Sequence, residues 1–430
     1  MQPLEFSLTN YRTGLSEGLY TPPDSMSPFF AIDPKAYSNL GDTESRRGDL
    51  KWGLEEIRKR TGPDYFKNFY PLQAQTLDYS ARAFPPYRFI LTEVMTEDWL
   101  ATVDWGKFQR DHVLHQPLCG YVALELLKQT IPNGKTILDE CVDKILQWKG
   151  TSYIRDFLLD CGMKKDDPIL DSESPIARTV WTLFFKEAAY LAAVFHDIGY
   201  PWQYAFQFKK NLDGMNAQGV NPNRNAKDIV GQFGQRLMFH ALNGYQKQDR
   251  ACPSTWPEKL LRLTDSALSS SHGFMGAIGF LTMNDSVRRY PAPQSPLHLL
   301  LVEWVATAIM MHDMAKIYWG NRKERENPEN PFLRLSFDVD PLSAFITLVD
   351  EIEDFERPTV SFSPANNGEN GVSITYGMAC HATELNFKNK SKSLEICYCM
   401  TTPEDKAMKL KSLHEHAEHD ILAPGMATWI

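Results

Sequence analysis

Hydrophobic positions recur at helical spacing along most of the chain between Glu97 and Pro358. Apolar side chains three and four positions apart predict helices over 137–149, 153–161, 175–196, 226–243 and 257–268. Similar runs predict a helix started by Pro117, one following His272, one over 296–317 and one over 341–352. The pattern therefore predicts a mainly α protein with a helical bundle at its centre.

The two ends of the chain have a different character. Residues 1–96 are rich in Pro, Gly, Ser, Tyr and Asp and contain one helical pattern, over 49–60, which predicts an irregular N-terminal extension. Beyond Pro358, β-branched and aromatic runs predict strands over 359–362, 372–378 and 394–400, followed by a helix over 403–420. We therefore expect an extension over 1–96, a helical domain over 97–358 and a small α+β appendage over 359–430.

Local signals mark the ends of two of these helices. Gly199 and Pro201 stop the helix that runs through His196. Asp340 is the expected N-cap of the last core helix and Pro341 its first residue. Asp350 follows one turn after Ile346 on that helix, so we expect it to point partly inward.

Composition narrows the classes of function. With 430 residues and 43% hydrophobic residues, the chain can bury a large core. A net charge of -9 makes a nucleic-acid polymer an unexpected partner, although nucleotide-sized ligands stay open. The sequence shows neither a secretory signal nor an apolar run of the roughly 20 residues that a membrane span needs. Seven scattered cysteines without a C-x-x-C pair indicate reduced thiols and a cytoplasmic protein, and the oligomeric state is left open.

The apolar run that begins at Tyr190 ends in the adjacent pair His196-Asp197. Burying an imidazole beside a carboxylate costs several kcal/mol unless a charge or a metal compensates them. Further candidates lie at the helix ends or inward faces: His115, His272, His312 and Asp350. Nitrogen and oxygen donors without a thiolate suit Mn, Fe, Co, Ni or Zn, and a carboxylate flanked by histidines can bridge two ions. We therefore predict a site for one or two divalent transition metals.

The order of these residues, H…HD…H…H…D, resembles that of the HD superfamily of metal-dependent phosphohydrolases over residues 97–358. The resemblance implies that His115, His196, Asp197 and Asp350 hold one ion. It implies a second ion on His272 and His312, bridged by Asp197. The implied activity is hydrolysis of a phosphomonoester or phosphodiester in a nucleotide-like small molecule by a metal-activated water.

The chain departs from the family pattern around the HD pair. The family often has a lysine soon after the pair, whereas this chain has Tyr200-Pro201-Trp202. Lys316, one turn after His312, is our candidate for contacting the substrate phosphate. Asp313 stands where Asn is commoner in the family and adds negative charge near the site.

Two positions near the first ligand are also open to other interpretations. Asp111 is a further candidate that could orient an imidazole or join the ligands. His112 competes with His115 for the ligand role.

The same residues allow other interpretations. A mixed-valent di-iron oxygenase of the HD superfamily would use the same ligands, and a non-catalytic binding or scaffold protein would use the metals structurally. His272 could instead bond a carbonyl at the start of its helix, which would leave one ion. The aromatic residues Tyr200, Trp202, Tyr204 and Phe206 either stack on a substrate base or pack in the core.

Overall fold

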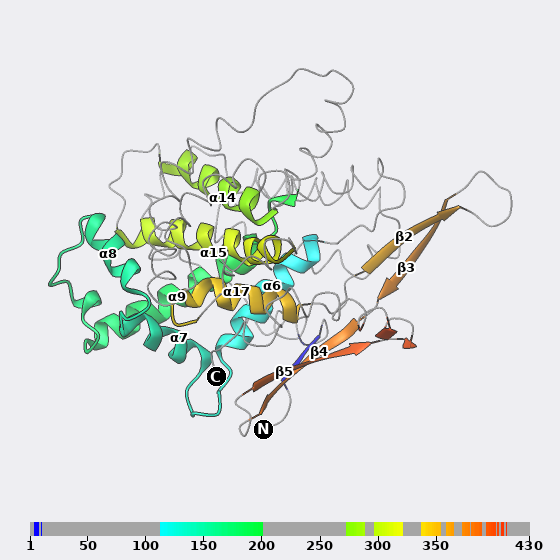
Figure 1. The fold of residues 1–430 in the computed structure, drawn as a ribbon, viewed down its shortest axis with the longest axis horizontal. Helices are drawn as coiled ribbons and strands as arrows, with labels where there is room; N and C mark the ends of the chain where they lie inside the picture. Colours follow the sequence, from blue (N-terminus) through cyan, green and yellow to red (C-terminus); the bar gives the residue numbers. More distant parts are fainter. Residues whose placement is uncertain are drawn as a thin grey trace, which may run out of the picture. The chain divides into compact units, whose positions relative to one another are not determined.

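The computed structural model describes residues 4–7, 10, 112–200, 272–288, 296–320, 337–353, 358–364, 372–378, 380–388, 393–400, 402–403, 406–407 and 410. Within these ranges the backbone forms seven α-helices and five β-strands (Figure 1). The described residues up to 122 and from 351 onward belong to one compact unit, and those from 123 to 350 belong to the other. The prediction of a mainly helical core with a small β-containing part toward the C-terminus is confirmed.

The helical unit is built from segments whose apolar stripes face inward. Its elements are α7 (Ile137–Leu146), α8 (Ser152–Asp160), the 3-10 helix η2 (Pro168–Leu170), α9 (Pro175–Phe195), α14 (His272–Arg288), α15 (Pro296–Gly320) and α17 (Pro341–Ile352) as far as Asp350. α7 begins with a capping box, in which the Thr136 side chain accepts from the Asp139 amide and the Asp139 carboxylate accepts from the Thr136 amide. Such caps satisfy backbone donors that the first turn of a helix leaves without partners.

α9 is the helix around which this unit packs. Its second half, from Ala188 to Phe195, is buried except at Tyr190, so this segment can place the residues that follow it inside the protein. Aromatic contacts tie α9 to its neighbours: Phe185 meets Trp304 of α15 at a centroid distance of 6.0 Å and Phe345 of α17 at 6.1 Å. Close-packed rings of this kind have few alternative arrangements, so they fix the helices from which the site residues project.

α17 starts as its sequence predicts. The Asp340 carboxylate accepts from the Ser343 amide at 3.2 Å, which is an N-cap interaction, and Pro341 is the first helical residue. The same carboxylate accepts from the Trp304 indole N–H at 3.0 Å. The cap therefore also ties the start of α17 to α15.

The other unit contains the strands and parts of two helices. β1 (Leu4–Phe6), β4 (Cys380–Lys388) and β5 (Ser393–Met400) form an antiparallel sheet in the order β1-β4-β5, and β2 (Pro358–Pro364) pairs with β3 (Val372–Met378). Phe6 of β1 is fully buried and meets Tyr121 of α6 (His112–Leu127) edge to face at 5.8 Å. The N-terminal segment, which we predicted to be irregular, thus contributes a strand.

Among the described residues, most predicted elements agree with the structure to within three residues, whereas the start of α6 was misplaced and strands β1 and β4 were not predicted. α6 begins at His112 and not at Pro117, so His115 lies on the helix and not before it. A proline this near the helix start removes only one backbone hydrogen bond, and the buried side chains of Leu118 and Val122 offset that loss. The strand β4 was missed because two adjacent polar residues, Thr383 and Glu384, interrupt the alternation of apolar and polar positions.

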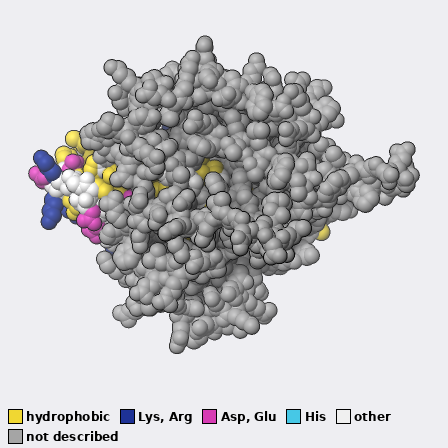
Figure 2. Space-filling model, turned by 90° about the horizontal axis from the view of Figure 1, so that it is seen from above, with side chains coloured by type: hydrophobic (Ala, Val, Ile, Leu, Met, Phe, Trp, Pro, Cys, Tyr) yellow, Lys and Arg dark blue, Asp and Glu magenta, His cyan; other side chains and the backbone are white. Residues whose placement is uncertain are grey.

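Charged groups of both signs meet on the described surface. Figure 2 shows Lys or Arg and Asp or Glu side chains beside hydrophobic ones at the left edge of that view. Asp143 of α7 pairs with Lys135 at 2.6 Å and with Arg178 of α9. In the part of the chain that the structure describes, no helix combines the length and the apolar character that crossing a membrane requires.

Several predicted elements lie outside the described residues. These are the helices over 49–60, 226–243 and 257–268, the aromatic residues Trp202, Tyr204 and Phe206, and the candidate Asp111. Of the final helix, the described positions Pro403, Lys406, Ala407 and Leu410 are helical.

Candidate metal centre

His196 and Asp197 occupy the turn that ends α9. His196 is the C-cap of the helix, and both side chains are buried, with His196 0% and Asp197 3% exposed. His196 Nδ1 lies 2.7 Å from the Ala193 carbonyl. A carbonyl only accepts, so in the neutral ring this nitrogen carries the proton and Nε2 keeps its lone pair. The local helix geometry therefore holds the ring in the tautomer that a metal ligand requires.

His312 on α15 is held in the same way. Its Nδ1 donates to the Ile309 carbonyl three residues earlier, so its Nε2 is also the basic nitrogen. Complete burial lowers the pKa of the His312 imidazole below its usual value, and the nearby His196 and His272 lower it further, whereas Asp197 opposes the shift. The ring is therefore neutral near pH 7, as a metal ligand must be.

The Asp197 carboxylate lies among three of these imidazoles. Its Oδ1 is 3.2 Å from His272 Nε2 and 3.6 Å from His312 Nε2. Its Oδ2 is 3.5 Å from His196 Nε2, which in turn lies 3.4 Å from Asp350 Oδ1. The two oxygens of one carboxylate therefore face two different sets of donors.

These separations match those expected for atoms that share an ion. Nitrogen and oxygen ligands lie about 2.0–2.2 Å from a tetrahedral zinc ion, so two ligands of one ion are roughly 3.3–3.6 Å apart. The three distances around Asp197 and the one between His196 and Asp350 lie in or next to this range, and so does the 3.2 Å between His272 Nε2 and His312 Nε2. The residues present could therefore hold a metal ion.

His272 begins α14 and presents both ring nitrogens to acidic groups. Its Nε2 faces Asp197, and its Nδ1 lies 3.4 Å from Asp313 Oδ2. Tyr200 stacks on the ring at a centroid distance of 4.1 Å and an interplanar angle of 11°. His272 therefore faces the acidic residues instead of serving only as a helix-start histidine, and the tyrosine after the HD pair packs on a predicted ligand.

Two glycines allow α14 to approach the other two elements of the site. A Cβ on Gly199 would lie 1.8 Å from the His272 carbonyl oxygen and 2.4 Å from the Gly276 amide nitrogen. A Cβ on Gly273 would lie 2.7 Å from both Asp313 Cβ and the Ile309 carbonyl oxygen. The sequence suggested only a helix stop at Gly199, whereas the structure shows that its missing side chain makes room for His272.

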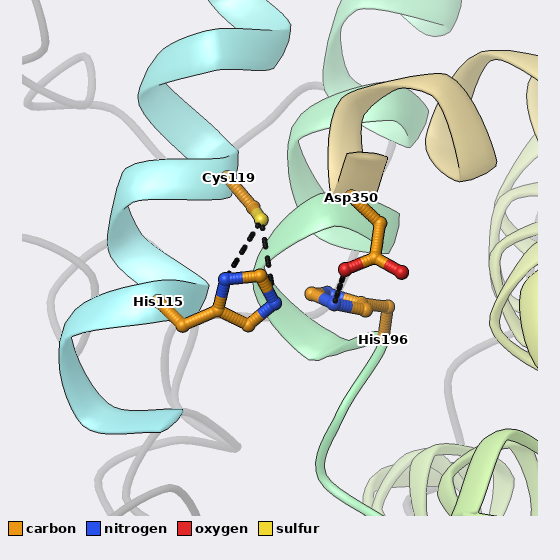
Figure 3. Close-up of side chains that lie close together, drawn as sticks. All are labelled: His115, Cys119, His196 and Asp350. Carbon is orange, nitrogen blue, oxygen red and sulfur yellow. Dashed lines mark hydrogen bonds and ion pairs between the residues drawn. The ribbon is translucent and has the colours of Figure 1, made fainter. Parts of the chain in front are cut away.

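A second group of side chains includes the first predicted ligand. Figure 3 shows His115 and Cys119 of α6 with His196 and Asp350, and one ligand atom from each lies within 4.8 Å of the others. His196, Asp197 and His312 satisfy the same criterion. All six predicted ligand residues therefore occur in the ion-sized groups or in the contacts of Asp197. Cys119 joins them, although the predicted ligands included no thiolate.

His115 has two neighbours that the sequence reasoning did not single out. Its Nδ1 forms a buried ion pair with Glu353, one residue beyond the end of α17. The Cys119 sulfur lies 3.6 Å from Nδ1 and 3.7 Å from Nε2. Helical spacing carried a usable signal in both cases, because Cys119 follows His115 by four residues and Glu353 follows Asp350 by three.

The edges of the centre are partly open to solvent. The side chains of Asp350 and His272 are 15% and 13% exposed, whereas that of His312 is fully buried. Lys316 lies on α15, and its side chain is outside the described residues.

Comparison with known proteins gives no match. No protein-family model, curated protein or solved structure matches the chain.

Proposed function

We propose that the protein is a metal-dependent phosphohydrolase that acts on a phosphomonoester or phosphodiester of a nucleotide-like small molecule. The observation that carries the proposal is the placement of Asp197. Its Oδ1 faces His272 and His312, and its Oδ2 faces His196. A carboxylate between two donor sets is the arrangement that holds two ions side by side in phosphoryl-transfer sites.

The residues have distinct tasks in this proposal. His196 and Asp350 would hold one ion with Asp197 Oδ2, and His272 and His312 would hold the other with Asp197 Oδ1. When bound, the ions supply Lewis acidity and lower the pKa of a coordinated water. The backbone carbonyls of Ala193 and Ile309 keep two imidazoles in their ligating tautomer.

The substrate class rests on the resemblance to the HD superfamily and on the chemistry of the ions. His115, which that pattern makes the first ligand, belongs to the group in Figure 3. Paired divalent ions bind the oxygens of a phosphoryl group and neutralise the charge that develops on them. Lys316, one turn after His312 on α15, is proposed to contact the phosphate.

Elemental analysis of protein purified without chelators, followed by a phosphatase and phosphodiesterase panel with Mn²⁺, tests this proposal. We expect bound transition metal and turnover of at least one nucleotide ester. Asp197→Asn should abolish turnover, whereas Asp156→Asn, at an exposed position of α8, should not change it. Absence of metal from the wild-type protein after reconstitution would overturn the proposal.

One observation favours a second candidate, a mixed-valent di-iron oxygenase with the same ligands. Tyr200 stacks on His272 at the place where a phosphohydrolase of this family often has a lysine, so this position supplies no cation for a phosphate. Turnover under strict anaerobiosis with Mn²⁺ or Co²⁺ supports hydrolysis. Dioxygen consumption that requires iron supports the oxygenase instead.

The third hypothesis is that the protein is a non-catalytic scaffold. In that case Asp197→Asn would leave the biological activity intact wherever the fold survives. Comparing the melting temperature of this variant with its activity in the same preparation separates a structural metal from a catalytic one.

A further inference from the structure

The three histidines around Asp197 differ in what their second ring nitrogen meets. His196 Nδ1 and His312 Nδ1 each bond a backbone carbonyl of their own helix. His272 Nδ1 instead lies 3.4 Å from the carboxylate of Asp313, which is on a different helix. A carboxylate beside an imidazole N–H makes the other nitrogen a stronger donor than a neutral carbonyl does.

Asp313 is itself fixed in place. Its Oδ2 accepts from the Gly273 amide N–H at 3.2 Å, and its side chain is only 8% exposed. A Cβ on Gly273 would lie 2.7 Å from Asp313 Cβ, so glycine at 273 is what allows this approach. The same oxygen therefore binds the first turn of α14 and faces the ring that this turn carries.

The face of the His272 ring is also covered. Tyr200 stacks on it nearly parallel, so the ring is held by Asp313 at Nδ1 and by Tyr200 across one face. Its Nε2 then points to Asp197 Oδ1 and His312 Nε2, both 3.2 Å away. The ring has a ligating orientation before any ion arrives.

We propose that Asp313 is a positioning residue for the ion on the Oδ1 side of Asp197, acting through His272. This inference rests on the metal centre of the proposed function. It gives the negative charge of Asp313 a role other than repelling an anionic substrate, because the imidazole of His272 lies between Asp313 and Asp197. The ion on the His196 and Asp350 side does not depend on Asp313.

Metal titration of the metal-free protein with Mn²⁺, followed by calorimetry and electron paramagnetic resonance, tests the inference. We expect the wild-type protein to bind two ions that give an exchange-coupled Mn–Mn signal. Asp313→Asn keeps an oxygen acceptor for the Gly273 amide but removes the charge. This variant should lower the affinity for one of the two Mn²⁺ ions by ~10–100-fold and replace the coupled signal by that of an isolated ion.

Two matched variants separate this role from a general structural one. Asp350→Asn should weaken the other ion, and Asp156→Asn should leave both ions and the coupled signal unchanged. Asp313→Glu, which restores the charge, should recover part of the lost affinity. These comparisons use variants whose thermal unfolding remains cooperative, so a folding defect is recognised independently.

The outcomes distinguish this inference from the proposed function. Two ions with wild-type affinities and an intact coupled signal in Asp313→Asn would overturn the positioning role while leaving the metal centre standing. Failure of the wild-type protein to bind any ion would overturn both.

Discussion

At Asp197 a buried carboxylate has imidazole nitrogens within 3.2–3.6 Å on both oxygens. Two further carboxylates, Asp313 and Asp350, lie near the same histidines. With neutral imidazoles and all three acids ionised, the cluster carries a formal charge of -3. Uncompensated charge in a buried site is strongly unfavourable, and two divalent ions would more than neutralise it.

The buried imidazole of His312 predicts how stability depends on pH. Burial lowers its folded-state pKa below the ordinary value of 6.5, so the unfolded chain binds this proton more tightly than the folded protein does. The neutral His312 imidazole therefore contributes to the free energy of unfolding above pH 6.5, and this contribution is lost as the pH falls toward the lowered pKa. One proton contributes at most about 1.4 kcal/mol per pH unit to this slope.

Urea unfolding of the metal-free protein between pH 7.5 and pH 5 measures this effect. His312→Gln should flatten the slope, whereas His381→Gln, at an exposed position of β4, should leave it unchanged. An unaltered slope in the His312 variant would assign the pH dependence to other groups.

Breaking the buried pair of His115 and Glu353 is predicted to lower the free energy of unfolding. Glu353→Gln removes the charged partner of an imidazole whose side chain and partner are both fully buried. Breaking a buried pair of this kind costs ~3–5 kcal/mol of unfolding free energy. Chemical denaturation measures it, with Glu125→Gln as the control, because the exposed pair of Glu125 with Lys128 contributes roughly 0–1 kcal/mol.

At the scale of elements, α14 depends on a glycine outside the helix. Gly199→Ala would place a methyl group 1.8 Å from the His272 carbonyl, and backbone cannot move aside as a side chain can. We expect α14 to shift away from the HD turn, with a loss of ~1–3 kcal/mol in stability and a clear loss of metal affinity. Denaturation and metal titration of the same variant measure the two effects.

Gly134→Ala is the matched control for this steric effect. An added Cβ there meets nothing within 4 Å, although φ of +85° strains a side chain. It should lower stability while leaving metal binding unchanged. Equal metal binding in both variants would show that the contact at Gly199 does not position His272.

The helices and strands show which parts of the fold can be predicted from the sequence alone. The Asp340 cap and strand β3 were predictable, because a capping residue and a β-branched run are local signals. β1 was not, because a three-residue strand has no periodicity and forms only through its partner β4. The start of α6 was misplaced because Pro117 was taken as a first helical residue, whereas the buried packing of the helix overrides that preference.

The site residues show the same difference between features with a local sequence signal and features that depend on packing. The ligand order followed from the resemblance to a known family, and five of the six predicted ligands occur in the ion-sized groups, with His272 beside Asp197. The pairing of His272 with Asp313 required three-dimensional packing, since it joins side chains from different helices, whereas Cys119 and Glu353 lie at helical spacing from predicted ligands. A sequence can indicate which side chains could meet, but the helix packing decides which ones do.

At the scale of the molecule, the donors around Asp197 lie far apart in the chain. They run from His196 to Asp350 on four helices, and an unfolded chain cannot present them together. An ion that binds them therefore binds the folded state and stabilises it by mass action. Metal binding and folding should be coupled in this protein.

This coupling predicts a metal-dependent melting temperature. At a free Mn²⁺ or Zn²⁺ concentration of about 100 times Kd, one bound ion adds ~2.7 kcal/mol to the unfolding free energy. For a domain of this size each kcal/mol raises Tm by roughly 2–4 °C, so an increase of roughly 5–10 °C over the chelator-treated protein is expected. Asp197→Asn should lose most of this increase because it removes a ligand from both donor sets, whereas Asp156→Asn should retain it. Differential scanning calorimetry measures the shift, and identical melting temperatures with and without metal would contradict a site formed by the fold.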